Sequence, residues 1–352
     1  MRRWARVLPL LPCMAAILAL STVPAVARSE ATLRRSGADS QCTRIILLGT
    51  GGGPVARKFR SQPANLLIVD GKPYLIDAGA GVVRQLVWAG FQPPQIRTIF
   101  LMNLHIDHEA GLESLISFIW FNSSMVGRIR PAVQLYGPPS TRFLLHSALA
   151  FLSVSERIFS SEMALAPAAP MFNAHDIDRD GTFYQDGRIR VTAVENALYH
   201  FKPGTPSYGR DKSYAFRFDT PQGAVVFTGD TGPSAAVTRL ARGAQVLVSE
   251  VIDPQAVISQ MEASGHMAPT LLREVTYHME HEHLTPDAVG RMASAAHVKA
   301  VILTHFGPGL DSETTTTQYT AGVERHFSGA VIPGADLLEY DLCGLAGDRL
   351  AK

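Results

Sequence analysis

The sequence predicts an α/β fold in which two β-sheets pack together and helices cover their outer faces. Runs rich in β-branched and aromatic residues alternate with helical stretches from residue 44 onward. The second half of the chain repeats this alternation, and no low-complexity linker separates the two halves. With 352 residues, 46% of them hydrophobic, the chain is long enough to bury a sizeable core.

The first half carries five expected strands, at 44–49, 65–70, 73–78, 96–102 and 132–137. A hairpin turn at 70–72 joins the second strand to the third, and helices are expected at 81–90 and around 109–121. The Gly-rich segment 49–54 lacks the Lys-Ser/Thr pair of a phosphate-binding P-loop, so we expect a tight turn there. Residues 138–187 have no readable motif and are expected to be an insertion over the fold.

The second half carries strands at 188–195, 213–219, 223–230, 244–251 and 298–306. A helix is expected at 284–297, with Thr285 as its N-cap and Pro286 at its first position. Both halves therefore supply several strands followed by helices, as two packed sheets with outer helices require.

Residues 1–27 are expected to be a signal peptide and residues 28–352 a single domain. A basic start, an apolar run of about 14 residues and the series Ala25-Val26-Ala27 follow the pattern of a cleaved secretory signal. The apolar run is shorter than the ~20 residues that span a bilayer, so a retained signal anchor is the weaker alternative. We therefore expect a periplasmic or secreted protein without stable membrane insertion.

Charge and cysteine content bear on the partners of the mature chain. Loss of Arg2, Arg3 and Arg6 with the signal peptide lowers the formal charge from +1 to −2. We therefore expect no nucleic-acid partner. Cys42 and Cys343 remain and are disulfide candidates in an oxidising compartment, with two buried thiols as the alternative.

Side chains of the metal-ligand type follow several of the expected strands: His105, Asp107, His108, His200, Asp230 and His305. Zinc takes imidazole and carboxylate ligands, and a catalytic zinc site leaves one position for water. One such histidine would be an ordinary structural residue. The convergence of so many at the ends of successive strands predicts a metal site.

The spacing inside segment 103–108 suggests two metals. Residues i and i+2 of an extended segment point the same way, so positions 103 and 105 can address one metal. Asp107 and His108 then turn toward a second, and Asp230 can bridge both. Position 103 is Asn, whose amide oxygen is a poorer zinc ligand than an imidazole nitrogen.

At these residues the sequence resembles the metallo-β-lactamase superfamily, whose H-x-H-x-D-H signature is similar to NLHIDH at 103–108. The segments GTGGGP (49–54), LIDAG (75–79) and HLTPDA (283–288), with THF at 304–306, resemble the branch that holds ribonuclease Z and exported arylsulfatase-like hydrolases. The resemblance runs from about residue 44 to residue 342. It implies a four-layer αββα sandwich with two zinc ions at one edge.

The resemblance also implies two sets of ligands. The first zinc would bind His105, His200 and, weakly or not at all, Asn103. The second zinc would bind Asp107, His108 and His305, and Asp230 would lie between the two metals. Every ligand of the second site keeps its usual type, so we expect that zinc to be tight. The first should be weaker and partly lost on purification. An alternative is that a histidine from 278–283 compensates for Asn103.

The same resemblance implies that His283 protonates the leaving group and that Glu250 orients His283, with a solvated surface residue as the alternative for His283. Asp77 is expected to support the ligands or a turn rather than to bind metal. Asp107 would ligate zinc and orient a hydroxide formed from zinc-bound water. We therefore expect a zinc-dependent hydrolase of small-molecule phosphodiesters or sulfate esters, whose leaving groups need a proton.

The sequence favours three other functions less. A β-lactam or lactone hydrolase is the enzyme alternative, since ring opening has less need of a dedicated acid. A degenerate metal-binding protein of the same fold is the non-enzyme alternative. RNA processing is expected to fit poorly, because residues 139–187, where a tRNA-binding arm would be sought, carry three basic and six acidic side chains.

Overall fold

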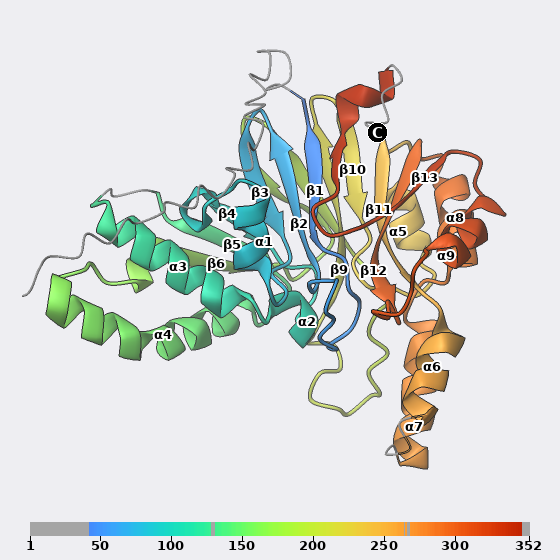
Figure 1. Cartoon of the computed structure of the whole chain (residues 1–352), viewed down its shortest axis with the longest axis horizontal. Helices are drawn as coiled ribbons and strands as arrows, with labels where there is room; N and C mark the ends of the chain where they lie inside the picture. The colour runs from blue at the N-terminus through green and yellow to red at the C-terminus, as the bar shows by residue number, and fades with distance from the viewer. Residues whose placement is uncertain (1–41, 128–130, 264, 266–267, 347–352) are drawn as a thin grey trace, which may run out of the picture. The chain divides into compact units, whose positions relative to one another are not determined.

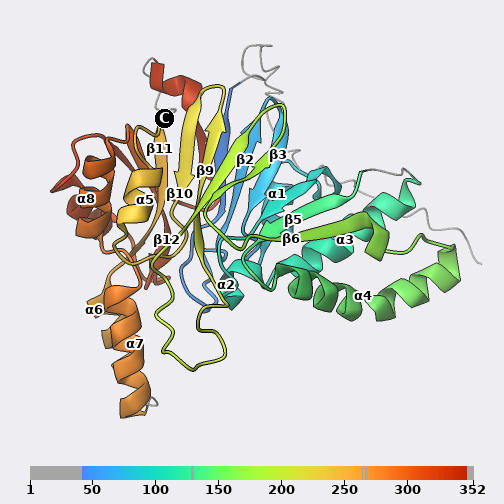
Figure 2. The ribbon, with the colours of Figure 1, turned by 180° about the vertical axis from the view of Figure 1, so that it is seen from behind.

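The computed structural model describes residues 42–127, 131–263, 265 and 268–346, and the expected signal peptide lies outside them. Within these ranges two seven-stranded sheets pack face to face (Figures 1 and 2). The first sheet has the spatial order β14 (Glu339–Asp341), β1 (Arg44–Gly49), β2 (Ala64–Val69), β3 (Lys72–Ile76), β4 (Thr98–Phe100), β5 (Val133–Gly137) and β6 (Phe172–Asp176). The second has the order β13 (Ala330–Pro333), β12 (Ala300–Gly307), β11 (Val246–Ile252), β10 (Gly223–Phe227), β9 (Tyr214–Thr220), β8 (Arg190–Glu195) and β7 (Gly181–Gln185).

Helices cover the outer face of each sheet (Figures 1 and 2). The first sheet is covered by α1 (Val82–Trp88), α3 (Leu112–Met125) and α4 (Thr141–Met163), and the second by α5 (Ala235–Leu240), α8 (Pro286–Ala296) and α9 (Thr317–Glu324). The short α2 (Ile106–Glu109) lies at one edge of the two sheets, and α6 (Pro254–Ala263) and α7 (Pro269–His281) extend away from that edge.

The buried side chains form three layers, which confirms the predicted αββα sandwich. Strand β1 illustrates the pattern: Ile45 and Leu47 pack between the sheets, while Ile46 and Leu48 pack under the helices of the first sheet. This alternation follows from the two-residue period of a strand. A third layer, which includes Leu247 and Val289, fills the space between the second sheet and its helices.

Local sequence signals place several turns and caps as expected. Asp70 and Gly71, with φ angles of 48° and 74°, form the two-residue turn between β2 and β3. The Thr285 hydroxyl accepts a hydrogen bond from the Ala288 amide, 3.3 Å away, and Pro286 is at the first turn of α8. Residues 138–187 supply α4 and the edge strands β6 and β7 of the two sheets.

The two ends of the described chain meet at the edge of the first sheet. Strand β14 pairs antiparallel with β1, with Asp341 opposite Arg44. This pairing brings Cys42 beside Cys343, and the predicted disulfide is present with its Cα atoms 5.8 Å apart.

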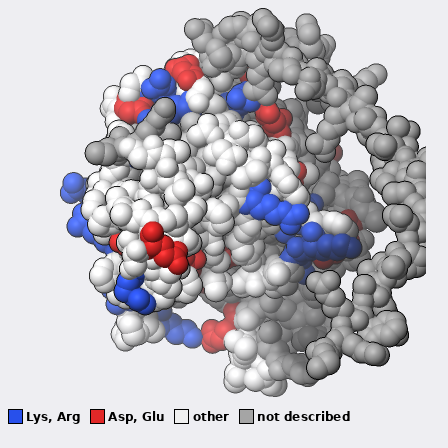
Figure 3. Space-filling view, turned by 60° about the vertical axis from the view of Figure 1, so that its left-hand side comes forward, with Lys and Arg blue, Asp and Glu red and all other residues white. Residues whose placement is uncertain are grey.

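The outer surface of α3 and α4 exposes large apolar side chains. Phe143 and Phe151 are 72% and 71% exposed, and Phe118 is also exposed. Figure 3, which turns the α3 and α4 side forward, shows few charged side chains across the described surface. None of the described helices is both long and apolar enough to cross a membrane.

Candidate metal centre

The segment 103–108 turns sharply from a strand into a helix at the edge of the sheets. Strand β4 ends at Phe100, and α2 begins at Ile106 with His105 as its N-cap. Asp107 and His108 lie in α2 and are buried, because the helix packs its polar face inward at this edge. Their carboxylate and imidazole therefore point into the protein.

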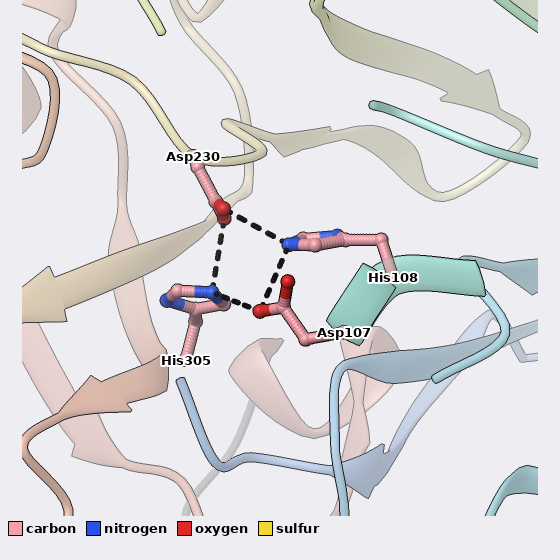
Figure 4. A group of neighbouring side chains, drawn as sticks. All are labelled: Asp107, His108, Asp230 and His305. Atoms are coloured by element: carbon pink, nitrogen blue, oxygen red, sulfur yellow. Dashed lines mark hydrogen bonds and ion pairs between the residues drawn. The ribbon is translucent and has the colours of Figure 1, made fainter. Parts of the chain in front are cut away.

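Four buried side chains from three parts of the chain meet there: Asp107 and His108 of α2, Asp230 after β10, and His305 of β12 (Figure 4). His108 Nε2 lies 2.9 Å from Asp230 Oδ2 and 3.7 Å from Asp107 Oδ2. His305 Nε2 lies 3.3 Å from Asp107 Oδ2 and 3.3 Å from Asp230 Oδ1. One donor atom from each residue lies within 4.8 Å of the others.

This donor set fits a divalent metal of the zinc type. Two imidazole nitrogens and two carboxylate oxygens are ligands that zinc accepts, and four is its usual coordination number. Asp230 Oδ1 is buried without a hydrogen-bond partner, so it is available to a cation. The structure thus brings together Asp107, His108 and His305 of the second predicted site and the predicted bridging residue Asp230, while their role as ligands stays a prediction.

Asp77 contacts Nδ1 of His108, the ring nitrogen that does not face the cluster. Asp77 Oδ2 lies 2.8 Å from His108 Nδ1, and Asp77 Oδ1 accepts a hydrogen bond of 2.8 Å from the Met102 amide. A histidine whose Nδ1 donates to a carboxylate presents its Nε2 lone pair to a metal. Asp77 therefore fixes the orientation of the His108 ring, and its part in supporting a metal ligand stays a prediction.

Without a metal, the four side chains neutralise one another. Burial opposes charge on His305, but Asp230 and Asp107 outweigh it and raise the pKa of His305 to about 9. Burial likewise opposes charge on His108, but Asp230 and Asp77 raise its pKa well above the ordinary value. Burial would raise the pKa of Asp230, yet His108 and His305 hold that pKa below its ordinary range. Without a metal, protonated His108 and His305 would thus balance the two carboxylates, and a divalent cation would carry the same charge.

Glu250 and His283 form a buried pair beside the cluster. His283 Nδ1 lies 2.6 Å from Glu250 Oε2, and the His283 ring stacks 6.0 Å from the His305 ring between centroids. Glu250 Oε1 accepts a hydrogen bond from the Thr231 amide, which fixes the carboxylate. Burial lowers the pKa of His283 to about 4 and raises that of Glu250 well above its ordinary value.

The predicted residues of the first site are not members of this compact cluster. The Asn103 side chain bonds the backbone of its own turn, since Oδ1 accepts from the His105 amide at 2.8 Å. The His105 ring packs 5.2 Å from the Tyr199 ring between centroids. His200, whose side chain is 46% exposed, lies 3.1 Å from a Glu282 oxygen through Nδ1.

The structure adds Glu282 and Gly52, to which the sequence does not point, and it singles out His278 among the histidines of 278–283 that the sequence offers as alternative ligands. Glu282 and His278, at the end of α7, contact His200 and His283. Their i, i+4 spacing on a helix is a signal that could have paired them with each other, though not with the site. Gly52 is the other addition, because a Cβ there would lie 2.8 Å from His305 Nδ1.

Comparison with known proteins agrees with the fold. Residues 73–306 match the model of the beta-lactamase superfamily domain. Ribonuclease Z of Mycobacterium avium is 29% identical over 301 residues, which cover 83% of this chain and 96% of that protein. Ribonuclease Z of Mycolicibacterium paratuberculosis is 28% identical over the same shares of the two chains.

Solved structures share the fold at lower identity. The metallo-beta-lactamase fold protein YhfI from Bacillus subtilis has a TM-score of 0.61 at 16% identity, covering 85% of this chain and 99% of that one. The short form of human tRNase Z has a TM-score of 0.58 at 19% identity over the same shares.

The expectation that nucleic acid is excluded as a partner is wrong. The curated relatives are named as ribonucleases, which act on RNA. A net charge of −2 is a sum over the whole mature chain, and it does not prevent metal ions and a few side chains from binding a phosphodiester locally. The buried cluster, the αββα sandwich and the family match lead to one conclusion: this chain belongs to the metallo-β-lactamase superfamily and is a metal-dependent hydrolase.

Proposed function

We propose that this protein is a zinc-dependent phosphodiesterase and that RNA belongs to its substrate class. The observation that carries the proposal is the buried Glu250–His283 pair, which lies against the Asp107–His108–Asp230–His305 cluster. The cluster suits a metal, and the pair suits the protonation of a leaving group outside a ring. The ribonuclease names of the curated relatives support RNA as the source of the ester.

The ligands divide between two metals of unequal affinity. Asp107, His108, Asp230 and His305 would hold the tight one, because they are buried and already gathered. His105 and His200 would serve the weaker one, since His200 is half-exposed and Asn103 offers no imidazole. A bound metal would activate water and neutralise charge that develops on the phosphate.

The chain's own residues supply position and a proton. Asp107 orients the attacking water from the metal side. Burial raises the pKa of Glu250 and lowers that of His283, so the pair shares a proton between Glu250 Oε2 and His283 Nδ1. His283 can therefore donate through Nε2 to the departing oxygen while Nδ1 takes the proton from Glu250. As water adds to phosphorus and releases one proton to the solvent, the P–O bond to the leaving group breaks and that oxygen takes a proton from His283. The solvent then returns a proton to the Glu250–His283 pair.

A substrate panel tests the reaction class. The metal-loaded protein should hydrolyse an aryl phosphodiester and a short RNA faster than an aryl sulfate, a lactone or a β-lactam. Faster turnover of the sulfate would identify a sulfatase, and preference for a ring substrate would remove the need for His283. Either result would refute the proposal.

His283→Ala tests the proton donor. We expect phosphodiesters with poor leaving groups to slow by roughly 10²–10⁴-fold, which is the range for loss of a general acid. Esters that release nitrophenolate, a stable anion, should slow much less. Rates measured with both ester types decide the point, and equal losses would show that His283 does not donate the proton.

We also infer that the protein is exported and cleaved after Ala27. The segment 1–27 has the composition of a signal peptide, and a Cys42–Cys343 disulfide is typical of an oxidising compartment. Mass spectrometry of extracytoplasmic protein should find Arg28 at the N-terminus. A soluble cytoplasmic form that retains Met1 would contradict export.

A further inference from the structure

The end of α7 lies where the first predicted metal site would be. Glu282, the C-cap of α7, is buried, although α7 itself has no buried residue. Its Oε1 lies 3.1 Å from Nδ1 of His200. Its Oε2 bonds Nδ1 of His278, one turn earlier on the same helix. A carboxylate is therefore held between two imidazoles.

In its observed orientation, the Asn103 side chain is a poor ligand for the first metal. Its Oδ1 accepts the His105 amide hydrogen bond that shapes the turn into α2. Its Nδ2 is buried without a hydrogen-bond partner, and an amide NH₂ is a donor that does not bind cations. Residue 103 thus offers the first site only the second lone pair of a neutral oxygen that already accepts a hydrogen bond.

The group around Glu282 adjoins the buried cluster. The His278 ring lies 6.1 Å from the His105 ring between centroids, so the first-site imidazole of α2 is beside α7. His278 Nε2 lies 3.3 Å from Nε2 of His283, whose ring stacks on His305. His105 interacts electrostatically with Asp230, whose Oδ1 accepts no hydrogen bond and lies 3.3 Å from His305 Nε2.

We propose that Glu282 replaces Asn103 as the third protein ligand of the first metal, together with His105 and His200. This inference rests on the proposed two-metal phosphodiesterase and adds a ligand to it. A carboxylate oxygen is a regular zinc ligand at 2.0–2.2 Å, and it carries the charge that the Asn103 amide lacks. His278 is a positioning residue, because it holds the other carboxylate oxygen.

The geometry also explains why this metal would be the weaker one. Its donors are less closely gathered than the four buried donors of Figure 4. The His200 side chain is 46% exposed, so its ring can turn toward a cation without disturbing the core, while the Glu282 carboxylate has to leave its contact with His200 Nδ1. These movements order two side chains and so cost affinity.

Metal content tests the ligand role without any measurement of turnover. The protein is dialysed against a fixed free Zn²⁺ concentration, and zinc per chain is measured by mass spectrometry for the unmodified protein, Glu282→Gln and Glu280→Gln. Glu280 is the matched control, since it is exposed near the end of the same helix and accepts a hydrogen bond from Gln255. We expect two zinc ions in the unmodified protein and the control, and one in Glu282→Gln.

Two further variants guard against misfolding. His200→Gln alters a half-exposed side chain and should also leave one zinc ion. His278→Ala should weaken the first site by roughly 10–100-fold, as loss of a residue that orients a ligand does. Adding Asn103→His to Glu282→Gln should restore the second zinc ion, because it refills the same coordination position.

Two zinc ions in Glu282→Gln at the affinity of the unmodified protein would overturn the assignment. A single zinc ion in the unmodified protein under saturating Zn²⁺ would overturn it as well. Neither result depends on phosphodiester hydrolysis, so the inference can fail while the proposed reaction stands, and the reaction can fail while the ligand assignment stands.

Discussion

At the scale of single residues, the centre is a balance of two carboxylates and two imidazoles. Asp107 and Asp230 face His108 and His305 at distances of 2.9–3.7 Å. Buried charges of this kind are stable only when paired, and in the metal-free protein the protonated histidines provide the pairing. A divalent cation would replace both protons at once.

That balance predicts proton release on metal binding. The pKa of His305 is raised to about 9 and that of His108 lies well above its ordinary value, so both are protonated at neutral pH without metal. Zinc binding at pH 7 should release roughly two protons, and affinity should increase as the pH rises toward 9. Calorimetry in buffers of different ionisation enthalpy measures the release, and heats independent of the buffer would contradict it.

The same shifts set the pH dependence of stability for the metal-free protein. The folded pKa of His305 exceeds its ordinary 6.5, so its contribution is fully present below pH 6.5 and is lost as the pH rises through about 9. The metal-free protein should therefore lose stability on the alkaline side, whereas bound zinc should remove that loss. Denaturation midpoints measured with and without zinc between pH 6.5 and 9.5 compare the two forms.

At the scale of elements, the site depends on the approach of the 49–54 turn to β12. A Cβ at Gly52 would lie 2.8 Å from both the ring Nδ1 and the carbonyl oxygen of His305. His305 itself has a φ of 48°, a conformation that side-chain-bearing residues seldom adopt. The turn and the strand thus fix the direction of one ligand together.

Gly52→Ala should displace His305 and weaken the tight metal. We expect zinc affinity to fall by roughly 10–100-fold, as for other losses of ligand orientation. Gly187→Ala is the control, since a Cβ at Gly187 would meet nothing within 4 Å. Zinc titration of both variants decides the matter, and equal affinity in the two would show that the turn does not position His305.

The elements also show what the sequence could predict and what it could not. Strands such as β1 and β9 were predictable because alternate residues face two apolar layers, and the ligands could be located because they follow those strands. The position of α7 was not, since no residue of that helix is buried and no apolar pattern specifies its docking. Glu282 was missed for this reason, and His278 could be named only as one of the histidines in 278–283.

At the scale of the whole chain, the termini of the domain are joined covalently. The Cys42–Cys343 disulfide closes a loop with a sequence separation of 301, next to the β1–β14 pair. The exclusion of nucleic acid failed at this same scale, because a net charge says nothing about where phosphate can bind. The net charge of a whole chain predicts solubility better than it predicts substrates.

Reduction of the disulfide should lower the free energy of unfolding by roughly 2–5 kcal/mol. Urea denaturation with and without a thiol reductant measures this difference. The double variant Cys42→Ser/Cys343→Ser should match the reduced protein and show no response to the reductant. Equal stability of the oxidised and reduced proteins would show that the bridge does not constrain the chain.

The central claim is that phosphodiester hydrolysis requires a metal held by the buried cluster. The most direct measurement is the rate of hydrolysis of an aryl phosphodiester after chelation and during stepwise return of zinc. It compares the unmodified protein, Asp230→Asn and the surface control Asp219→Asn. In the unmodified protein Asp219 pairs with Arg190 and Arg217, outside the cluster. The account predicts no hydrolysis after chelation, recovery in proportion to bound zinc in the unmodified protein and the control, and no recovery in Asp230→Asn. Hydrolysis by the fully chelated protein, or full activity of Asp230→Asn, would contradict it.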